Sequence, residues 1–261
     1  MSTRPTTVNT RATRLIIVGA SGRMGARLCQ IAHDEDRFTL VGALTRAGSE
    51  RAARPAATDS AKGPAPKITD SAAVFGPSCA DVVIDFSSSA GTLAAIELAR
   101  RVNASLLVGT TALDTPALGL LRAESRSRAV LLAPNTSLGV AALADLVRRA
   151  AAMLKDFDCS LVESHHIKKK DAPSGTALRL AEAARKGGAN LPNDQVLAVR
   201  GGDVIGEHTL RFAGPGEYLE LSHRATSRDV FVRGALRAAA WLHGREPGWW
   251  TMEDVLGLEA R

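Results

Sequence analysis

The densest group of polar side chains in the sequence lies between His165 and Ala177. Two adjacent imidazoles, three consecutive lysines (Lys168 to Lys170) and a Ser174-Gly175-Thr176 turn fall within this one short segment. Imidazoles exchange protons near neutral pH, ammonium groups attract anions, and backbone N–H groups at the start of a helix bind carboxylates or phosphates. The segment therefore indicates an anion site with proton-transfer groups beside it.

The elements on either side of this segment are predicted to hold it in place. Residues 158–163 alternate polar and apolar side chains, which is typical of a half-buried strand. Pro173 ends any extension of that strand, and Ser174 is a suitable N-cap for a helix whose apolar residues from Ala177 to Ala184 recur at helical spacing. The basic loop is thus expected at a helix N-terminus, where the helix dipole favours an anion. From the loop alone, a solvated lysine face beside a structural histidine pair is an equally good interpretation.

A glycine-rich turn near the N-terminus indicates a nucleotide site. The apolar run at 15–18 leads into Gly19-Ala20-Ser21-Gly22-Arg23-Met24-Gly25, and apolar residues then recur with the period of a helix. Strand, glycine turn and helix form the context of a dinucleotide-binding unit, in which glycines let the backbone approach a pyrophosphate closely. An ordinary strand-to-helix turn is the alternative interpretation.

The end of the next predicted strand, residues 38–44, bears on the choice of cofactor. The residue that recognises the adenosine ribose is expected about 20 residues after the last glycine of the turn. Thr45 and Arg46 stand there. A carboxylate would bind a free 2′-hydroxyl, whereas an arginine would pair with a 2′-phosphate. The sequence therefore favours NADPH over NADH.

The remaining pattern predicts an α/β protein with a Rossmann-type doubly wound parallel sheet and a second, α+β domain with an open mixed sheet. Predicted strands at 81–86, 105–108 and 129–133 alternate with helical stretches, as in a parallel sheet whose ligands bind beyond the carboxyl ends of its strands. After Leu191, strands separated by glycine and proline turns follow one another. Their predicted ranges are 196–200, 204–212 and 218–222.

Composition argues against several classes of protein. The 261 residues carry a formal net charge of +6 but only 4% aromatic residues, without the interleaving of basic and aromatic residues that nucleic-acid binding needs. No apolar run approaches the roughly 20 residues of a membrane span. Cys29, Cys79 and Cys159 are far apart and form no metal-binding or redox motif, which fits reduced thiols in the cytoplasm. Residues 1–13 are expected to be a disordered tail, and 47–66 a mobile surface loop.

Together these segments resemble the dihydrodipicolinate reductase family, the 4-hydroxy-tetrahydrodipicolinate reductases of lysine and diaminopimelate biosynthesis, from about Arg14 to the C-terminus. The block from Glu163 to Ala177 carries most of the resemblance, because it is far more specific than a glycine turn. The other similar segments are Val18 to Gly25, Gly109-Thr110-Thr111, Arg200 to His208, His223 to Arg228, Gly234-Ala235 and Trp241-Leu242.

The resemblance implies that hydride from NADPH or NADH reduces a cyclic imine dicarboxylate. It implies His165 as proton donor or acceptor and Lys169 as a second acid. It places the substrate carboxylates at His166, Ser174, Gly175 and Thr176, with no metal. It places the cofactor at Gly19, Ala20, Ser21, Gly22, Arg23, Met24, Arg46, Gly109, Thr110, Thr111, Ala133, Pro134, Asn135 and Thr136.

The resemblance also implies a division of labour along the chain. Residues 14–135 and 229–261 are expected to form the dinucleotide-binding domain, and residues 136–228 the domain that binds substrate and builds a homotetramer. Three other functions compete with this interpretation: a nicotinamide-dependent dehydrogenase of an amino acid or amino dicarboxylate, a catalytically silent dinucleotide sensor and a nucleic-acid-binding module. The sensor would not need His165 or Lys169, and the dehydrogenase would not need the whole block around them.

Overall fold

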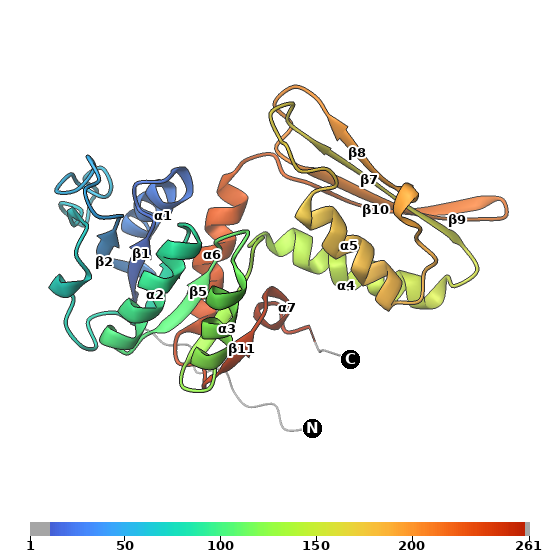
Figure 1. Ribbon diagram of the computed structural model, residues 1–261. Helices are drawn as coiled ribbons and strands as arrows, with labels where there is room; N and C mark the ends of the chain where they lie inside the picture. Colours follow the sequence, from blue (N-terminus) through green and yellow to red (C-terminus); the bar gives the residue numbers. More distant parts are fainter. Residues whose placement is uncertain (1–10, 259–261) are drawn as a thin grey trace. The chain divides into compact units, whose positions relative to one another are not determined.

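The computed structural model describes residues 11–258, which form two compact units. The first contains residues 11–134 and 235–251, and the second contains residues 135–234 and 252–258. The first unit is therefore built from both ends of the chain (Figure 1). Residues 1–10 of the predicted tail lie outside the described residues. Its last residue, Thr13, already belongs to the first strand.

A seven-stranded sheet forms the centre of the first unit, and all its neighbouring strands are parallel. In space the order is β11-β6-β5-β4-β1-β2-β3, so the chain reverses its direction across the sheet between β1 and β4. Such a switch point is where open α/β sheets bind their ligands. The strands are β1 (Thr13–Val18), β2 (Phe38–Leu44), β3 (Ile68–Thr69), β4 (Val82–Asp85), β5 (Ser105–Val108), β6 (Ala129–Leu132) and β11 (Gly248–Trp250).

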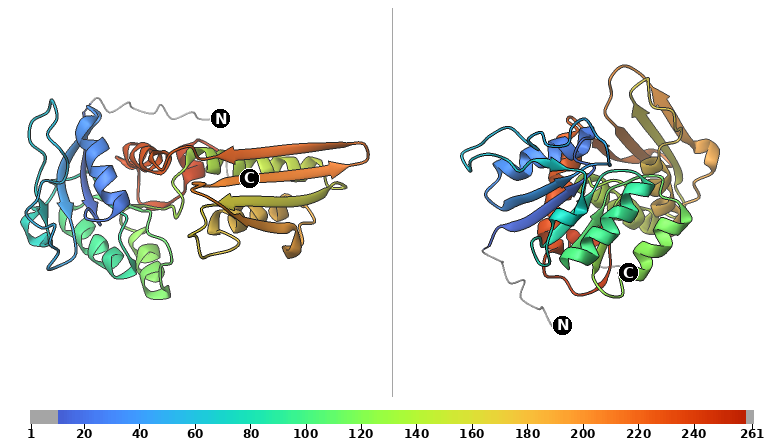
Figure 2. Two further views of the ribbon diagram at one scale, coloured as in Figure 1. Left: turned by 90° about the horizontal axis from the view of Figure 1, so that it is seen from above. Right: turned by 60° about the vertical axis from the view of Figure 1, so that its left-hand side comes forward.

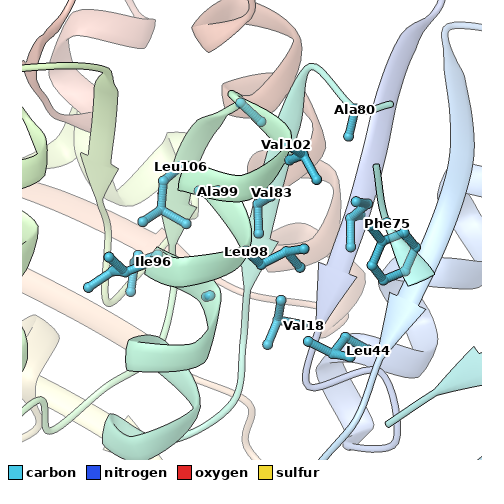
Figure 3. Close-up of a cluster of buried hydrophobic side chains, with 14 of the residues drawn as sticks. Val18, Leu44, Phe75, Ala80, Val83, Ile96, Leu98, Ala99, Val102 and Leu106 are labelled. Carbon is cyan, nitrogen blue, oxygen red and sulfur yellow. The ribbon is translucent and has the colours of Figure 1, made fainter. Parts of the chain in front are cut away.

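Helices on this sheet bury an aliphatic core. The helices are α1 (Arg23–Asp34), the short η1 (Ala72–Val74), α2 (Ser89–Val102), α3 (Thr115–Glu124) and α6 (Asp229–Leu242), which begins in the second unit. Ile96, Leu98 and Val102 of α2 pack on Val83 and Leu106 of the strands, and all five are fully or almost fully buried (Figure 3). Each such side chain contributes roughly 1.5–3 kcal/mol by leaving water. The sheet is thereby a rigid base for the loops at its edge.

The second unit is a four-stranded sheet with helices on one face (Figures 1 and 2). Its strand order is β10-β9-β7-β8, with β7 and β8 parallel and the other pairs antiparallel. Leu161, Leu210 and Phe212 of the sheet pack with Val147 of α4 and Leu180 of α5. The elements are α4 (Leu138–Met153), β7 (Asp158–His165), α5 (Gly175–Lys186), the short η2 (Asn193–Gln195), β8 (Val196–Arg200), β9 (Glu207–Gly214), β10 (Glu217–Arg224) and α7 (Met252–Val255).

The other face of this sheet is open, because no helix among the described residues covers it (Figure 2). Val162 of β7, Leu197 and Val199 of β8 and Tyr218 of β10 are exposed large apolar side chains. Val199 is 50% and Tyr218 64% exposed, which is far more than strand residues of a core retain. This open face is thus an unusual apolar surface for a folded unit.

The predicted fold class, a doubly wound parallel sheet plus a separate open mixed sheet, is confirmed. Several details differ from the sequence predictions. Strand β9 begins at Glu207 and not at 204, and neither α3 nor β11 was predicted. The segment from Met252 belongs to the second unit, where α7 contacts α4, although the sequence had grouped it with the first.

The segment 47–66 contains no helix and no named strand, but it is not a loose loop. Thr58 N–H donates to Gln30 of α1 at 2.9 Å, and the Lys62 ammonium donates to the Phe38 carbonyl at 3.1 Å. Nε2 of His33 lies 3.0 Å from the Gly63 carbonyl oxygen. The segment is therefore anchored on α1 and the start of β2. Its composition did not indicate these contacts.

None of the helices in the described part of the chain is long and apolar enough to cross a membrane.

Candidate active site

The glycine turn connects β1 to α1 in a conformation that requires its glycines. Gly19 has φ +83°, and a Cβ there would lie 2.3 Å from the Phe86 carbonyl oxygen. A Cβ on Gly25 would lie 2.1 Å from the Gly19 carbonyl oxygen. No larger residue fits either position without moving backbone. The turn therefore packs tightly on the residues that follow β4 and on its own helix, as a dinucleotide turn does.

The N-terminus of α1 differs from those of four other helices. Side-chain oxygens of Ser88, Asp114, Ser137 and Ser174 cap α2, α3, α4 and α5. Gly22 caps α1 without any side-chain hydrogen bond. The first N–H groups of α1 are thus left for another acceptor, and the helix dipole favours an anion there. These residues fit a pyrophosphate, with Ala20, Ser21, Arg23 and Met24 around it.

The end of β2 lies beside this turn. The Thr45 side chain is buried, and its hydroxyl lies 2.7 Å from the Ser21 hydroxyl. Arg46, the next residue, is exposed. Because β2 is the neighbour of β1, the structure brings Arg46 to the same edge of the sheet as the glycine turn. The side chain at position 45 therefore braces the turn, and the side chain at position 46 points to solvent.

A buried carboxylate organises the neighbouring strand ends. Asp85, the last residue of β4, is 0% exposed and accepts hydrogen bonds from the hydroxyls of Thr92 at 2.6 Å and Thr110 at 2.8 Å. It also accepts one from the Ser87 hydroxyl, and the Thr110 oxygen in turn accepts the Ser87 N–H at 2.9 Å. Burial raises the pKa of Asp85, and the hydroxyl donors oppose that rise. This cluster fixes the Gly109-Thr110-Thr111 loop to β4.

Replacing Thr110 by valine should lower the free energy of unfolding by roughly 1–3 kcal/mol, because the buried Asp85 loses a donor that valine cannot supply. Urea denaturation followed by circular dichroism measures this difference. Thr111→Val is the matched control, since Thr111 is exposed and its substitution should change stability by less than about 0.5 kcal/mol. Equal losses in both variants would show that the Asp85 contact contributes little.

The last predicted cofactor segment follows β6. Ala133 and Pro134 belong to the first unit, with the Ala133 N–H donating to the Val108 carbonyl at 2.8 Å. Asn135 and Thr136 belong to the second. The Asn135 amide donates to the Thr176 hydroxyl at 2.9 Å, and the buried Thr136 hydroxyl donates to the Phe231 carbonyl at 2.6 Å. Both of these polar side chains therefore already have partners within the second unit.

In the second unit, β7 and β8 place three charged or titratable side chains together. Glu163 and His165 lie on the same, helix-covered face of β7, and Nδ1 of His165 contacts Oε2 of Glu163. Arg200 pairs opposite His165 on β8, and its guanidinium donates to both Glu163 oxygens at 3.0 and 2.8 Å. Burial alone would raise the pKa of Glu163, but hydrogen bonds from Arg200 and His165 outweigh it and lower that pKa.

The basic loop after β7 carries the second predicted acid. The Lys169 ammonium lies 2.9 Å from Asp171 and is about one-quarter exposed. Lys168 and Lys170 on either side are exposed, and His166 is half-buried. The contact with Lys169 lowers the pKa of Asp171. Of the three lysines, Lys169 is thus the one that the loop holds toward the protein.

The loop ends at the N-terminus of α5, as predicted. The Ser174 oxygen accepts the Ala177 N–H at 3.1 Å, and the Ser174 N–H donates to Glu163 at 3.0 Å. The polar groups of Ser174 therefore serve the fold, while Gly175 is exposed at the first turn. Backbone N–H groups of Gly175 and Thr176 at this position can bind a carboxylate.

A second buried imidazole stands behind His165. The rings of His165 and His208 meet edge to face with centroids 5.2 Å apart, and Nε2 of His208 lies 3.4 Å from the Ser174 hydroxyl. Burial lowers the pKa of His208 to about 4, so this ring is neutral at neutral pH. Burial also lowers the pKa of His165, although its contact with Glu163 opposes the shift. A dianionic ligand would raise the pKa of His165 again.

Two family models together match most of the chain. The model of the dihydrodipicolinate reductase N-terminus matches residues 13–136, and that of the dihydrodipicolinate reductase C-terminus matches residues 139–256. The chain belongs to the dihydrodipicolinate reductase family. The class and reaction expected from the sequence, a nicotinamide-dependent oxidoreductase that reduces 4-hydroxy-tetrahydrodipicolinate in lysine and diaminopimelate biosynthesis, are thereby confirmed.

Full-length relatives agree with this family. A 4-hydroxy-tetrahydrodipicolinate reductase of Stenotrophomonas maltophilia (strain R551-3) is 41% identical, with 95% of this chain and 100% of the relative covered. One of Anaeromyxobacter dehalogenans (strain 2CP-C) is 39% identical over 94% of this chain and 98% of the relative. Both alignments span the glycine turn and the block from Glu163 to Ala177, because they cover nearly the whole chain.

Solved structures show the same fold. A dipicolinate-bound dihydrodipicolinate reductase from Paenisporosarcina sp. TG-14 has a TM-score of 0.72 at 20% identity, covering 92% of this chain and 97% of that one. The DAP dehydrogenase of C. glutamicum has a TM-score of 0.54 at 15% identity, covering 96% and 97%. The fold is therefore shared with other reductases and dehydrogenases, and the family assignment comes from the sequence matches.

The sequence analysis gave no role to three charged side chains of these polar clusters: Asp85 in the first unit, and Glu163 and Arg200 in the second. Glu163 stands two positions before His165 in an alternating strand, so their shared face was available as a signal. Arg200 reaches the site only through the register of β8 on β7, which the sequence does not show. Asp85 ends an apolar strand and faces hydroxyls from two other segments.

Proposed function

We propose that this chain reduces 4-hydroxy-tetrahydrodipicolinate with His165 as proton donor and Lys169 as a second cationic group. The observation that carries this assignment is the contact of His165 with the buried Glu163, next to a helix N-terminus and a basic loop. A nicotinamide dinucleotide supplies the hydride when bound. The overall change consumes NAD(P)H and one proton, and it releases NAD(P)⁺, water and tetrahydrodipicolinate.

The residues of the second unit suit this chemistry. Hydride addition to the conjugated imine leaves an electron pair and negative charge on the substrate, which a positioned cation stabilises and a proton neutralises. We assign the proton to His165 and the charge stabilisation to Lys169. The substrate carboxylates are assigned to the N–H groups of Gly175 and Thr176, with His166 and Ser174 beside them. A dicarboxylate at this position would keep both cations protonated.

The cofactor is assigned to the carboxyl edge of the parallel sheet. The uncapped N-terminus of α1 supports a pyrophosphate there, and the strand ends at Gly109 to Thr111 and at Ala133 and Pro134 lie along the same edge. Arg46 supports NADPH as the preferred form, because its exposed guanidinium follows β2 where a 2′-phosphate would lie.

Arg46→Ala should raise KM for NADPH by roughly 10- to 100-fold, the loss expected for a charge-assisted pair with phosphate, while KM for NADH changes little. Steady-state kinetics with each cofactor measure the ratio of the variant's KM to that of the wild type. Arg51→Ala, in the same exposed segment, is the control and should leave both constants unchanged. Equal increases for NADPH and NADH would assign Arg46 to some other part of the cofactor.

Two further properties belong to the same proposal. The open apolar face of the β7–β10 sheet supports a homotetramer in which copies of this chain cover that face, and sedimentation equilibrium should give four times the mass of one chain. The three cysteines are free thiols, which supports a reducing compartment, the cytoplasm. Nucleic acid and lipid are not expected as partners.

The decisive assay follows NADPH and NADH oxidation with substrate generated in place from pyruvate and aspartate semialdehyde by the preceding synthase. We expect rapid turnover that is lost in His165→Ala. Binding of a cofactor without turnover would retain the dinucleotide fold and refute the substrate. In that case an amino-acid dehydrogenase or a sensor would be the better interpretation.

A further inference from the structure

The Glu163 carboxylate is surrounded by groups that donate hydrogen bonds. Its side chain is 0% exposed. Oε1 accepts the Ser174 N–H at 3.0 Å and Arg200 Nη2 at 2.8 Å. Oε2 accepts Arg200 Nη1 at 3.0 Å and contacts Nδ1 of His165. An ionised carboxylate has only acceptor sites, so the fourth partner must also donate. Nδ1 of His165 therefore carries a proton.

The same pair connects the two parts of the loop. Arg200 Nη2 also donates to the Asp171 carbonyl at 2.6 Å, and the Asp171 carboxylate pairs with Lys169. The Ser174 N–H, at the start of α5, is held by Glu163 itself. The Glu163–Arg200 ion pair thus contacts His165 directly. It reaches Lys169 through Asp171, and the N-terminus of α5 through Ser174.

We propose that Glu163, held by Arg200, is the positioning residue that keeps the proton of neutral His165 on Nδ1, so that Nε2 is the atom that exchanges a proton with the substrate. The inference rests on the proposed reaction and deepens it. The surroundings of Nε2 agree, since a Cβ on Gly206 would lie 3.0 Å from it and glycine leaves that space open.

The assignment defines the proton step. With Nδ1–H donated to Glu163, neutral His165 offers only a lone pair at Nε2, and it becomes an acid only as the imidazolium. The Nε2–H bond of the imidazolium breaks as a bond from that proton to the substrate forms, using the electron pair left by hydride transfer. Neutral His165 remains, its Nδ1–H still donating a hydrogen bond to Glu163, and Nε2 takes its next proton from water.

The charges that face His165 set the direction of the pH effect. They are Glu163 on β7, Arg200 on β8, His208 on β9 and Lys169 on the loop. Burial lowers the pKa of His165, and among these groups Glu163 raises it while Arg200 and Lys169 lower it further. Removing the negative charge of Glu163 must therefore lower the pKa of His165. The acid form is then lost at a lower pH.

Glu163→Gln tests this with nearly unchanged shape. The nitrogen end of the new amide donates hydrogen bonds, and the Ser174 N–H and the Arg200 guanidinium cannot accept them. The ring of His165 can accept one, but only at an unprotonated Nδ1, with its proton carried on Nε2. We expect kcat at neutral pH to fall roughly 10²–10⁴-fold and the descending limb of kcat against pH to move to lower pH. Glu182→Gln, an exposed position on α5, is the matched control with an unchanged profile.

Nitrogen-15 NMR of histidine-labelled protein reads the tautomer without turnover. Signals of His165, assigned by their absence in His165→Gln, should show Nδ1–H in the wild type above its pKa and Nε2–H in Glu163→Gln. An Nε2–H tautomer in the wild type overturns the inference even if Glu163→Gln does not fold. The inference is also overturned if Glu163→Gln keeps both the descending limb of kcat against pH and the His165 tautomer of the wild type, whatever its kcat. A wild type with the Nδ1–H tautomer but no NADPH or NADH oxidation refutes the proposed reaction instead.

Discussion

Lys169→Met should lower kcat/KM for the dicarboxylate substrate by roughly 10²–10⁴-fold, through losses in both kcat and 1/KM. The reason is that the proposed function gives the ammonium two tasks. In that proposal it attracts a substrate carboxylate in the ground state, and it stabilises the negative charge that develops as hydride arrives. Methionine keeps the unbranched shape of the side chain and removes only the charge and the donors. Steady-state kinetics with varied substrate, at saturating NADPH, separate the two losses.

A general loss of positive charge would give a different result. Lys186→Met removes an exposed ammonium from the far end of α5, where it pairs with Glu182 at 2.7 Å, and should leave kcat/KM within a factor of two of the wild type. If Lys169→Met changes only KM, the ammonium binds substrate without assisting the reaction. Unchanged kinetics in Lys169→Met would remove this lysine from the site altogether.

Gly25→Ala should weaken NADPH binding by more than about 10-fold and reduce the free energy of unfolding by roughly 1–3 kcal/mol. The added methyl group would lie 2.1 Å from the Gly19 carbonyl oxygen and 2.6 Å from its carbon, so the whole glycine turn must move away from α1. The uncapped N–H groups then no longer lie where the pyrophosphate is expected. Isothermal titration calorimetry with NADPH and urea denaturation measure the two effects.

Gly119→Ala provides the control for this substitution. Gly119 lies within α3, and a Cβ there would meet no atom within 4 Å. Because alanine has the higher helix propensity, this variant should be as stable as the wild type or up to about 1 kcal/mol more stable, with unchanged NADPH affinity. Tight NADPH binding by Gly25→Ala would show that the turn tolerates displacement and that the pyrophosphate is held elsewhere.

Local patterns were sufficient to predict the glycine turn, the open mixed sheet and the loop that ends at Ser174. In each case neighbouring residues carry the signal: a glycine spacing, an alternation along a strand, or a cap before an apolar helix. Short edge elements gave no such signal. Strand β11 has only three residues, and its pairing with β6 depends on chain that is distant in sequence.

The charged groups of the site divide in the same way. The cluster that contains His165 and Lys169 was predicted because its polar residues stand together in the sequence, and the roles of the two residues came from the family resemblance. Arg200 was not, because it reaches Glu163 only when β8 pairs in parallel with β7 after an intervening helix. Strand β9 begins only after Gly206, a position where a Cβ would lie 3.0 Å from Nε2 of His165.

The order of synthesis imposes a delay on the nucleotide-binding unit. Strand β6 is synthesised long before its outer neighbour β11, which comes from residues 248–250. Residues 135–234, which form most of the second unit, are complete well before that. Until residues 248–250 emerge from the ribosome, β6 presents unpaired backbone groups at the edge of the sheet. A nascent chain, or one that ends before residue 248, therefore exposes this edge to any strand that can pair with it.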